Sequence, residues 1–130
     1  MNNVYFFILL ALVQYIYFTW QVGSARVKFG IDAPKITGND TFERTFRVQQ
    51  NTMEQLVIFI PGMLLFAYFV SPLWALVPGA FYLVGRQLYA RAYVADPKKR
   101  GTGATLSMLA PIILVLGAIG GLVWQMVSGT

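Results

Sequence analysis

The segment FERTFRVQQNTMEQLVIFIPGMLLFAYFV, Phe42 to Val70, sets the architecture, because a polar first half runs directly into an apolar second half. The apolar part, Leu56 to Val70, would form a helix only about 22 Å long at about 1.5 Å per residue. A hydrocarbon core is about 30 Å thick, so a spanning helix must reach back to about Asn51. This predicts a membrane helix in which Asn51 and Glu54 lie below the lipid surface, where polar groups normally face protein.

Three further apolar spans lie outside this segment. The chain is 57% hydrophobic and only 12% charged, which is far too apolar for a soluble domain of this size. Backbone groups in lipid must be hydrogen-bonded within their own segment, so each span should be a helix. We predict an all-α fold, an integral membrane four-helix bundle with up-down topology, formed by a single domain over residues 1–130. The three spans are Val4 to Val22, Leu73 to Leu88 and Leu106 to Val127.

Capping residues and prolines mark where these helices should begin and turn. Asn39-Asp40-Thr41 offers side-chain acceptors for the start of the second helix. Only Ser71-Pro72 separates the second span from the third, which predicts a tight antiparallel hairpin. In the last span, Gly117 and Gly121 are four residues apart, a spacing that permits close helix approach but is also common in membrane helices generally.

The basic residues predict which side of the membrane each loop faces. All ten Lys and Arg residues lie between Arg26 and Arg47 or between Arg86 and Arg100. The first and third loops should therefore be cytoplasmic and both termini outside, in a bacterial inner membrane or a eukaryotic endomembrane. Because these residues flank apolar spans, we expect no nucleic-acid partner. The same charge rule, together with contact to anionic lipid, accounts for the loop positions of four lysines, Lys28, Lys35, Lys98 and Lys99.

The chain contains neither cysteine nor histidine. This excludes disulfides, a cysteine nucleophile and a histidine general base, and it removes the usual ligands of zinc and haem, so we expect no metal site. Any reactive thiol must therefore arrive with a substrate.

Two polar stripes are predicted to face each other. At about 100° per residue, Arg44, Arg47, Asn51 and Glu54 share one helix face. Tyr82, Arg86, Tyr89 and Tyr93 share a face of the next helix by the same count. Two such faces would form a cleft open to the cytoplasm.

Glu54 and Arg86 would lie at similar depths in that cleft, and we expect them to form a buried ion pair. Arginines suit carboxylates and Glu54 suits an amine, so a small peptide-like zwitterion fits the cleft. The alternative for the arginines is that they lie near helix ends and reach up to anionic lipid.

Three segments carry a family resemblance. FERTFRVQQNTMEQ (42–55), GRQLYARAYVADPKKRG (85–101) and SARVKFGIDAP (24–34) resemble the MAPEG family, the membrane-associated proteins in eicosanoid and glutathione metabolism. The resemblance implies a homotrimer with glutathione as co-substrate, bound between neighbouring subunits. It also implies that Arg100 stabilises the glutathione thiolate, and that glutathione is held by Arg26, Arg47, Gln49, Asn51, Glu54, Tyr89 and Tyr93, to which the cleft argument adds Arg86.

The resemblance implies a membrane-bound glutathione transferase that conjugates glutathione to hydrophobic electrophiles from the bilayer, in detoxification, and that also acts as a glutathione peroxidase on lipid hydroperoxides. Gln55 and Val27 stand where leukotriene-synthesising members have a tyrosine and a second arginine, which favours the transferase branch. The alternative is a non-catalytic lipid-binding scaffold, like the lipoxygenase-activating branch of the family. A channel subunit is disfavoured because the polar residues do not follow the full span.

Overall fold

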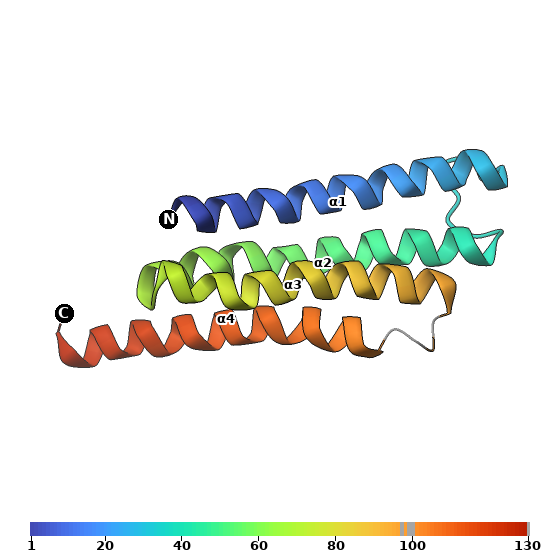
Figure 1. Cartoon of the computed structure of the whole chain (residues 1–130). Coiled ribbons are helices and arrows are strands. Elements are labelled where there is room, and N and C mark those ends of the chain that lie inside the picture. The colour runs from blue at the N-terminus through green and yellow to red at the C-terminus, as the bar shows by residue number, and fades with distance from the viewer. Residues whose placement is uncertain (97, 99–100, 130) are drawn as a thin grey trace.

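The computed structural model describes residues 1–96, 98 and 101–129, with the side chains of residues 101 and 102 excepted. Helices dominate this part of the chain, and they run alternately up and down (Figure 1). Both chain termini and the turn between the second and third helices lie at one end of the bundle, and the first loop lies at the other. The four helices are α1 (Asn2–Phe29), α2 (Asp40–Phe69), α3 (Pro72–Ala95) and α4 (Gly101–Ser128).

The predicted starts of α2 and α3 are confirmed. Asn39 has an extended backbone, and its side-chain oxygen accepts a hydrogen bond from the backbone N–H of Phe42 at 3.0 Å. The hydroxyl oxygen of Ser71 accepts a hydrogen bond from the backbone N–H of Trp74 at 3.3 Å, and Pro72 is the first residue of the helix. Both caps satisfy a backbone donor that the helix itself leaves open. The hairpin between α2 and α3 is therefore as short as the sequence indicates.

The end of α1 is built by a glycine and an arginine. Gly30 has φ 67°, in the left-handed region that favours glycine, and the next N–H, that of Ile31, returns to the carbonyl of Arg26 at 3.0 Å. The Arg26 guanidinium then donates to the carbonyl of Lys35 at 2.6 Å and lies 5.0 Å from the ring centre of Phe42. Arg26 thus ties the first loop to the start of α2.

Glycines allow α4 to pack closely on α2 and α3. A methyl group on Gly85 would lie 2.7 Å from the backbone nitrogen of Ser107, and one on Gly121 would lie 2.6 Å from the carbonyl oxygen of Phe69. A methyl group on Gly117 would overlap the ring of Phe66, a second close approach between α4 and α2. The close packing that the Gly117 and Gly121 spacing permits is therefore present within one chain.

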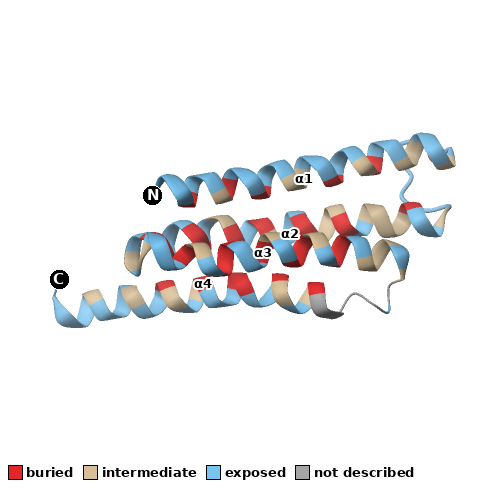
Figure 2. Cartoon of the chain, viewed as in Figure 1, coloured by how far each residue is buried: buried red, intermediate tan, exposed pale blue. Residues whose placement is uncertain are grey.

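Apolar side chains cover the outside of the bundle. Buried residues gather on the faces where helices meet, and exposed residues occupy the outward faces (Figure 2). Trp20, Trp74 and Trp124 are 65%, 64% and 71% exposed, together with many aliphatic side chains. A soluble monomer rarely exposes so much contiguous apolar surface, whereas lipid accommodates it.

Three described helical segments are long and apolar enough to cross a membrane, namely Asn2–Phe29, Asp40–Phe69 and Gly103–Ser128. Helix α3 is not among them, because Arg86, Gln87 and Arg91 make its second half polar. The fourth predicted crossing therefore stays a prediction, although α3 runs the same course as its neighbours (Figure 1).

Candidate functional site

Arg86 is the centre of a polar site inside the bundle. It lies on α3 where this helix meets α2 and α4, and its side chain is only 2% exposed. Its guanidinium donates to the side-chain oxygen of Asn51 at 2.8 Å, to the hydroxyl of Thr52 at 2.7 Å and to the hydroxyl of Ser107 at 3.3 Å. One arginine therefore connects three helices through neutral oxygen acceptors.

Two tyrosines on α3 continue this site toward the loop end of the bundle. The guanidinium carbon of Arg86 lies 4.5 Å from the ring centre of Tyr89, close enough for a cation–π interaction. Tyr89 stacks on Tyr93, with ring centres 5.4 Å apart and planes 12° apart. The predicted stripe from Arg86 through Tyr89 to Tyr93 is thus a continuous wall.

This wall faces a cavity of about 290 Å³ between α2, α3 and α4. Of the residues predicted for the site, the cavity brings together five from two helices. Gln55 from α2 and Ala104, Ser107 and Met108 from α4 complete it. The five predicted residues are Arg47, Asn51, Arg86, Tyr89 and Tyr93.

A second hollow of about 430 Å³ adjoins the cavity on the loop side. Arg47 and Tyr93 line both spaces, so the two form one cleft along α2 and α3. Asp40, Glu43 and Arg44 line the outer hollow. The cleft therefore offers both carboxylates and guanidinium groups near its mouth, and Arg86 with uncharged hydrogen-bonding groups deeper inside.

The prediction of a buried ion pair between Glu54 and Arg86 was wrong. Glu54 is exposed, and Arg86 is bonded to Asn51, Thr52 and Ser107, with no ion pair between the two in the described part of the chain. The reason is rotational: Asn51 and Thr52 turn toward α3 and α4, and Glu54 lies about 60° from Asn51 around α2, on the side away from Thr52. Glu54 is left on the outer surface of α2.

Arg26 and Gln49, also predicted for the site, lie elsewhere in the chain. Arg26 is bound to the first loop at Lys35, as described above. The amide of Gln49 donates to the hydroxyl of Thr19 on α1 at 3.2 Å, which places it on the α1 side of α2. Neither residue lines the cleft of its own chain. Arg100, the predicted catalytic residue, lies outside the described residues.

The predicted site did not include two small hydroxyl residues, Thr52 and Ser107, although they hold its central arginine. Thr52 and Ser107 are buried and accept hydrogen bonds from Arg86. Ser107 interrupts the apolar start of α4, which was an available signal. Tyr82, in contrast, was placed on the polar stripe, but it is buried against Phe59 with ring centres 3.8 Å apart and does not line the cleft.

The fold and this site define a class of protein, a membrane helical bundle with an arginine-centred cleft walled by tyrosines. The chain belongs to the MAPEG family, whose model matches residues 4–120. It is 39% identical to human microsomal glutathione S-transferase 2 over 113 residues, which is 86% of this chain and 77% of that protein. It is 33% identical to mouse leukotriene C4 synthase over 122 residues, 94% of this chain and 81% of that protein. An uncharacterized protein of Synechocystis sp. is 45% identical over 117 residues, 90% of this chain and 85% of that protein.

These findings confirm the family resemblance inferred from the three sequence segments. Together with the three helical segments that are long and apolar enough to cross a membrane, they make the chain an integral membrane protein. The all-α membrane bundle is likewise confirmed.

Proposed function

We propose that this protein is a membrane-bound glutathione transferase that joins the glutathione thiol to hydrophobic electrophiles taken from the bilayer. The observation that carries the proposal is the cleft in which Arg47, Asn51, Arg86, Tyr89 and Tyr93 meet. Human microsomal glutathione S-transferase 2 is, by its name, a glutathione transferase, and it aligns with most of this chain, as mouse leukotriene C4 synthase does.

The charges of the cleft suit the charges of glutathione. This tripeptide carries two carboxylates, one ammonium group and one thiol. Arg44 and Arg47 supply guanidinium groups for the carboxylates, and Asp40 and Glu43 supply carboxylates that can accept from the ammonium group. Asn51, Tyr89 and Tyr93 add donors and acceptors for the peptide groups.

The cleft of one chain is incomplete, which supports a homotrimer with shared sites. Glu54 is exposed beside it, and Arg26 and Gln49 lie on the α1 side. In a cyclic assembly each interface joins two different faces, so the α1 side of one copy would complete the cleft of the next.

The proposed chemistry uses the thiol of glutathione as the nucleophile. The thiol loses its proton to solvent, and Arg100, permanently cationic, stabilises the thiolate without acting as a base. The sulfur then forms a bond to the electrophilic carbon, and the displaced group or the added electron pair takes up a proton. With a lipid hydroperoxide, two glutathione molecules would instead be oxidised to the disulfide, giving the alcohol and water.

Holding the thiolate beside the apolar substrate would supply much of the rate acceleration. The two reactants are then kept in a reactive geometry and need not meet by diffusion in the membrane. The second substrate would enter from lipid, and an apolar groove of about 310 Å³ between α2 and α4 offers one such surface. The charge rule predicts that the cleft mouth faces the cytoplasm, from which glutathione would enter.

The test is turnover of purified protein with glutathione and a chromogenic electrophile, compared with Arg100→Ala. We expect wild-type activity well above buffer, and in the variant a weaker ultraviolet band of bound glutathione thiolate with little change in glutathione affinity. Lys98→Ala is the matched control, because it removes an exposed charge from the same connection. Wild-type turnover equal to buffer, with glutathione still bound, would leave the non-catalytic scaffold as the function.

A further inference from the structure

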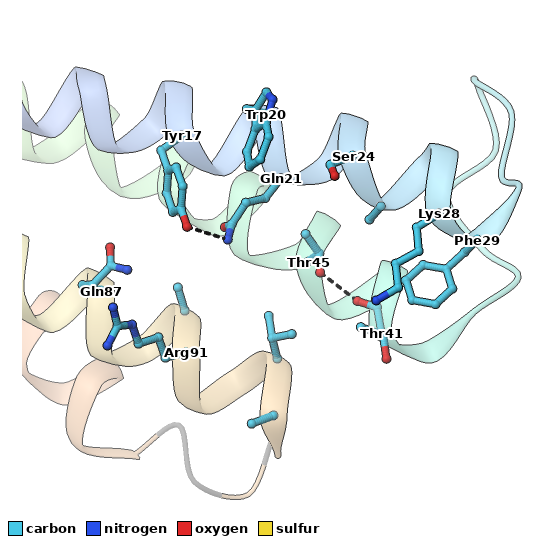
Figure 3. Close-up of a pocket in the computed structure, with 14 residues that line it drawn as sticks. Tyr17, Trp20, Gln21, Ser24, Lys28, Phe29, Thr41, Thr45, Gln87 and Arg91 are labelled. Carbon is cyan, nitrogen blue, oxygen red and sulfur yellow. Dashed lines mark hydrogen bonds between the residues drawn. The ribbon is translucent and has the colours of Figure 1, made fainter.

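A second polar cleft lies on the other side of α3, away from the Arg86 site. It has a volume of about 480 Å³ and is lined by residues of α1, α2 and α3 at the loop end of the bundle (Figure 3). None of its lining residues lines the cleft built around Arg86. We call it the α1–α3 cleft.

Two different faces of α3 line the two clefts. Gln87 and Arg91 are four residues apart, so they share one face, which is turned toward α1. Arg91 is about 200° around the helix from Tyr89, which faces the other cleft. Figure 3 shows Gln87 and Arg91 on α3, across the cleft from Tyr17, Trp20 and Gln21 on α1.

The charge of the α1–α3 cleft is positive. Lys28 from α1 and Arg91 from α3 line it, and its lining residues include no Asp or Glu. Arg91 and Lys28 make no side-chain hydrogen bond or ion pair among the described residues, and the nitrogen of Lys28 lies 5.3 Å from the ring centre of Phe29. Two cations without counter-ions in a cleft between membrane helices favour an anionic ligand.

The other lining residues are typical of the membrane interface. Tyr17 stacks on Trp20 with ring centres 6.2 Å apart, and such amphipathic rings prefer the headgroup level of a bilayer. On the bundle side, Gln87 accepts from the amide of Gln14 at 3.4 Å, and the same amide donates to the carbonyl of Leu83 at 3.0 Å. The cleft is therefore cationic with an aromatic edge, and it extends from the loop end toward the apolar part of the bundle.

We propose that the α1–α3 cleft binds the phosphate headgroup of an anionic membrane lipid, with Lys28 and Arg91 as its cationic ligands and Trp20 against its acyl chains. A basic pocket between membrane helices is a known form of lipid headgroup site. A soluble anion would gain the same charge contacts but would leave the aromatic edge without an apolar partner. The proposal does not depend on the glutathione reaction.

The experiment uses Trp20 as a local reporter. With Trp74 and Trp124 both replaced by Phe, the protein is reconstituted with acyl-brominated phosphatidylglycerol or with equally brominated phosphatidylcholine at the same mole fraction. Bromine quenches only nearby tryptophan, so quenching measures occupancy beside Trp20. We expect about thirtyfold preference for the anionic lipid, since two cations near the lipid surface contribute about 1 kcal/mol each. Equal quenching by both lipids would overturn the proposal.

Variants then locate the site. The double variant Lys28→Gln with Arg91→Gln should lose the preference, whereas Lys28→Arg with Arg91→Lys should keep it and also reports on folding. The control, Lys35→Gln with Lys98→Gln, removes the same charge from exposed positions that do not line the cleft. An equal loss in this control would mean diffuse surface attraction and overturn the proposal. Millimolar glycerol phosphate should not displace the lipid, and if it does, the ligand is a soluble anion instead.

Discussion

The guanidinium of Arg86 donates to the side-chain oxygen of Asn51 across 2.8 Å, and this bond joins α3 to α2 beside the cavity. The same group also holds Ser107 on α4. Asn51, Ser107 and Tyr89, which line the cavity from three helices, are thus positioned by one buried side chain. Arg86 therefore both belongs to the cavity wall and holds that wall together.

Replacing Arg86 should affect stability and binding together. Arg86→Gln removes the charged donor shared by Asn51, Thr52 and Ser107, and each such bond contributes about 1 kcal/mol. We expect destabilisation of about 2–3 kcal/mol, seen as a lower thermal midpoint in detergent, together with weaker glutathione binding. Arg86→Lys should restore the positive charge but not the three hydrogen bonds, because an ammonium group lacks the planar fork of a guanidinium. An unchanged thermal midpoint in both variants would contradict the conclusion that Arg86 holds the cavity wall together.

Close packing between α3 and α4 should be sensitive to a single methyl group. In Gly85→Ala the new carbon would lie 2.7 Å from the nitrogen of Ser107 and 2.9 Å from the Cβ of Leu106, so α4 would have to move away from α3. We expect a loss of about 1–3 kcal/mol, as in other overpacked cores.

Gly120→Ala is the matched control for this substitution, because nothing lies within 4 Å of its added carbon. The control should leave the thermal midpoint unchanged or raise it slightly, since alanine is the better helix former. If both variants lowered the midpoint equally, the close approach at Gly85 would not be the cause.

Glu54 should matter for binding and not for folding. It is exposed and makes no ion pair with Arg86 in the described chain, so Glu54→Gln should leave the thermal midpoint of the chain in place. If Glu54 accepts from the glutathione amine at a subunit boundary, the same variant should raise the glutathione KM about tenfold, a loss of about 1.4 kcal/mol. Unchanged KM would remove Glu54 from the site.

A shared site between subunits predicts complementation. Arg47 lines the cleft of its own chain, whereas Gln49 lies on the α1 side. Homogeneous preparations of Arg47→Ala and of Gln49→Glu should both be weakly active. In randomly mixed oligomers, about a quarter of the interfaces would combine two intact faces, and activity should rise accordingly. Mixtures no more active than the mean of the two parents would argue for sites contained within one chain.

Much of the fold was predictable because membrane helices follow from local chemistry. The apolar spans, the Asn39 and Ser71 caps and the short hairpin each depend on a few neighbouring residues, and all are present in the structure. The polar stripes were also predictable in part, since Arg47 and Asn51 do meet Arg86, Tyr89 and Tyr93. Helical periodicity predicts which residues share a helix face, and for these five residues the prediction agrees with the structure.

The partners of each polar side chain were not predictable from that periodicity. Depth and charge favoured Glu54 as the partner of Arg86, but the rotation of α2 directs Asn51 and Thr52 inward instead. Ser107 reaches Arg86 only because Gly85 lets α4 approach α3 closely.

By itself, the amino-acid sequence determined the membrane setting, the helix order and the family, because hydropathy, capping and short motifs are local properties. The packing of the helices determined which polar atoms meet, separated Arg26 and Gln49 from the Arg86 cleft, and opened a second cationic cleft on the other face of α3. Those outcomes depend on helix rotation and on approach distances set by side chains far apart in the chain, which no local pattern specifies.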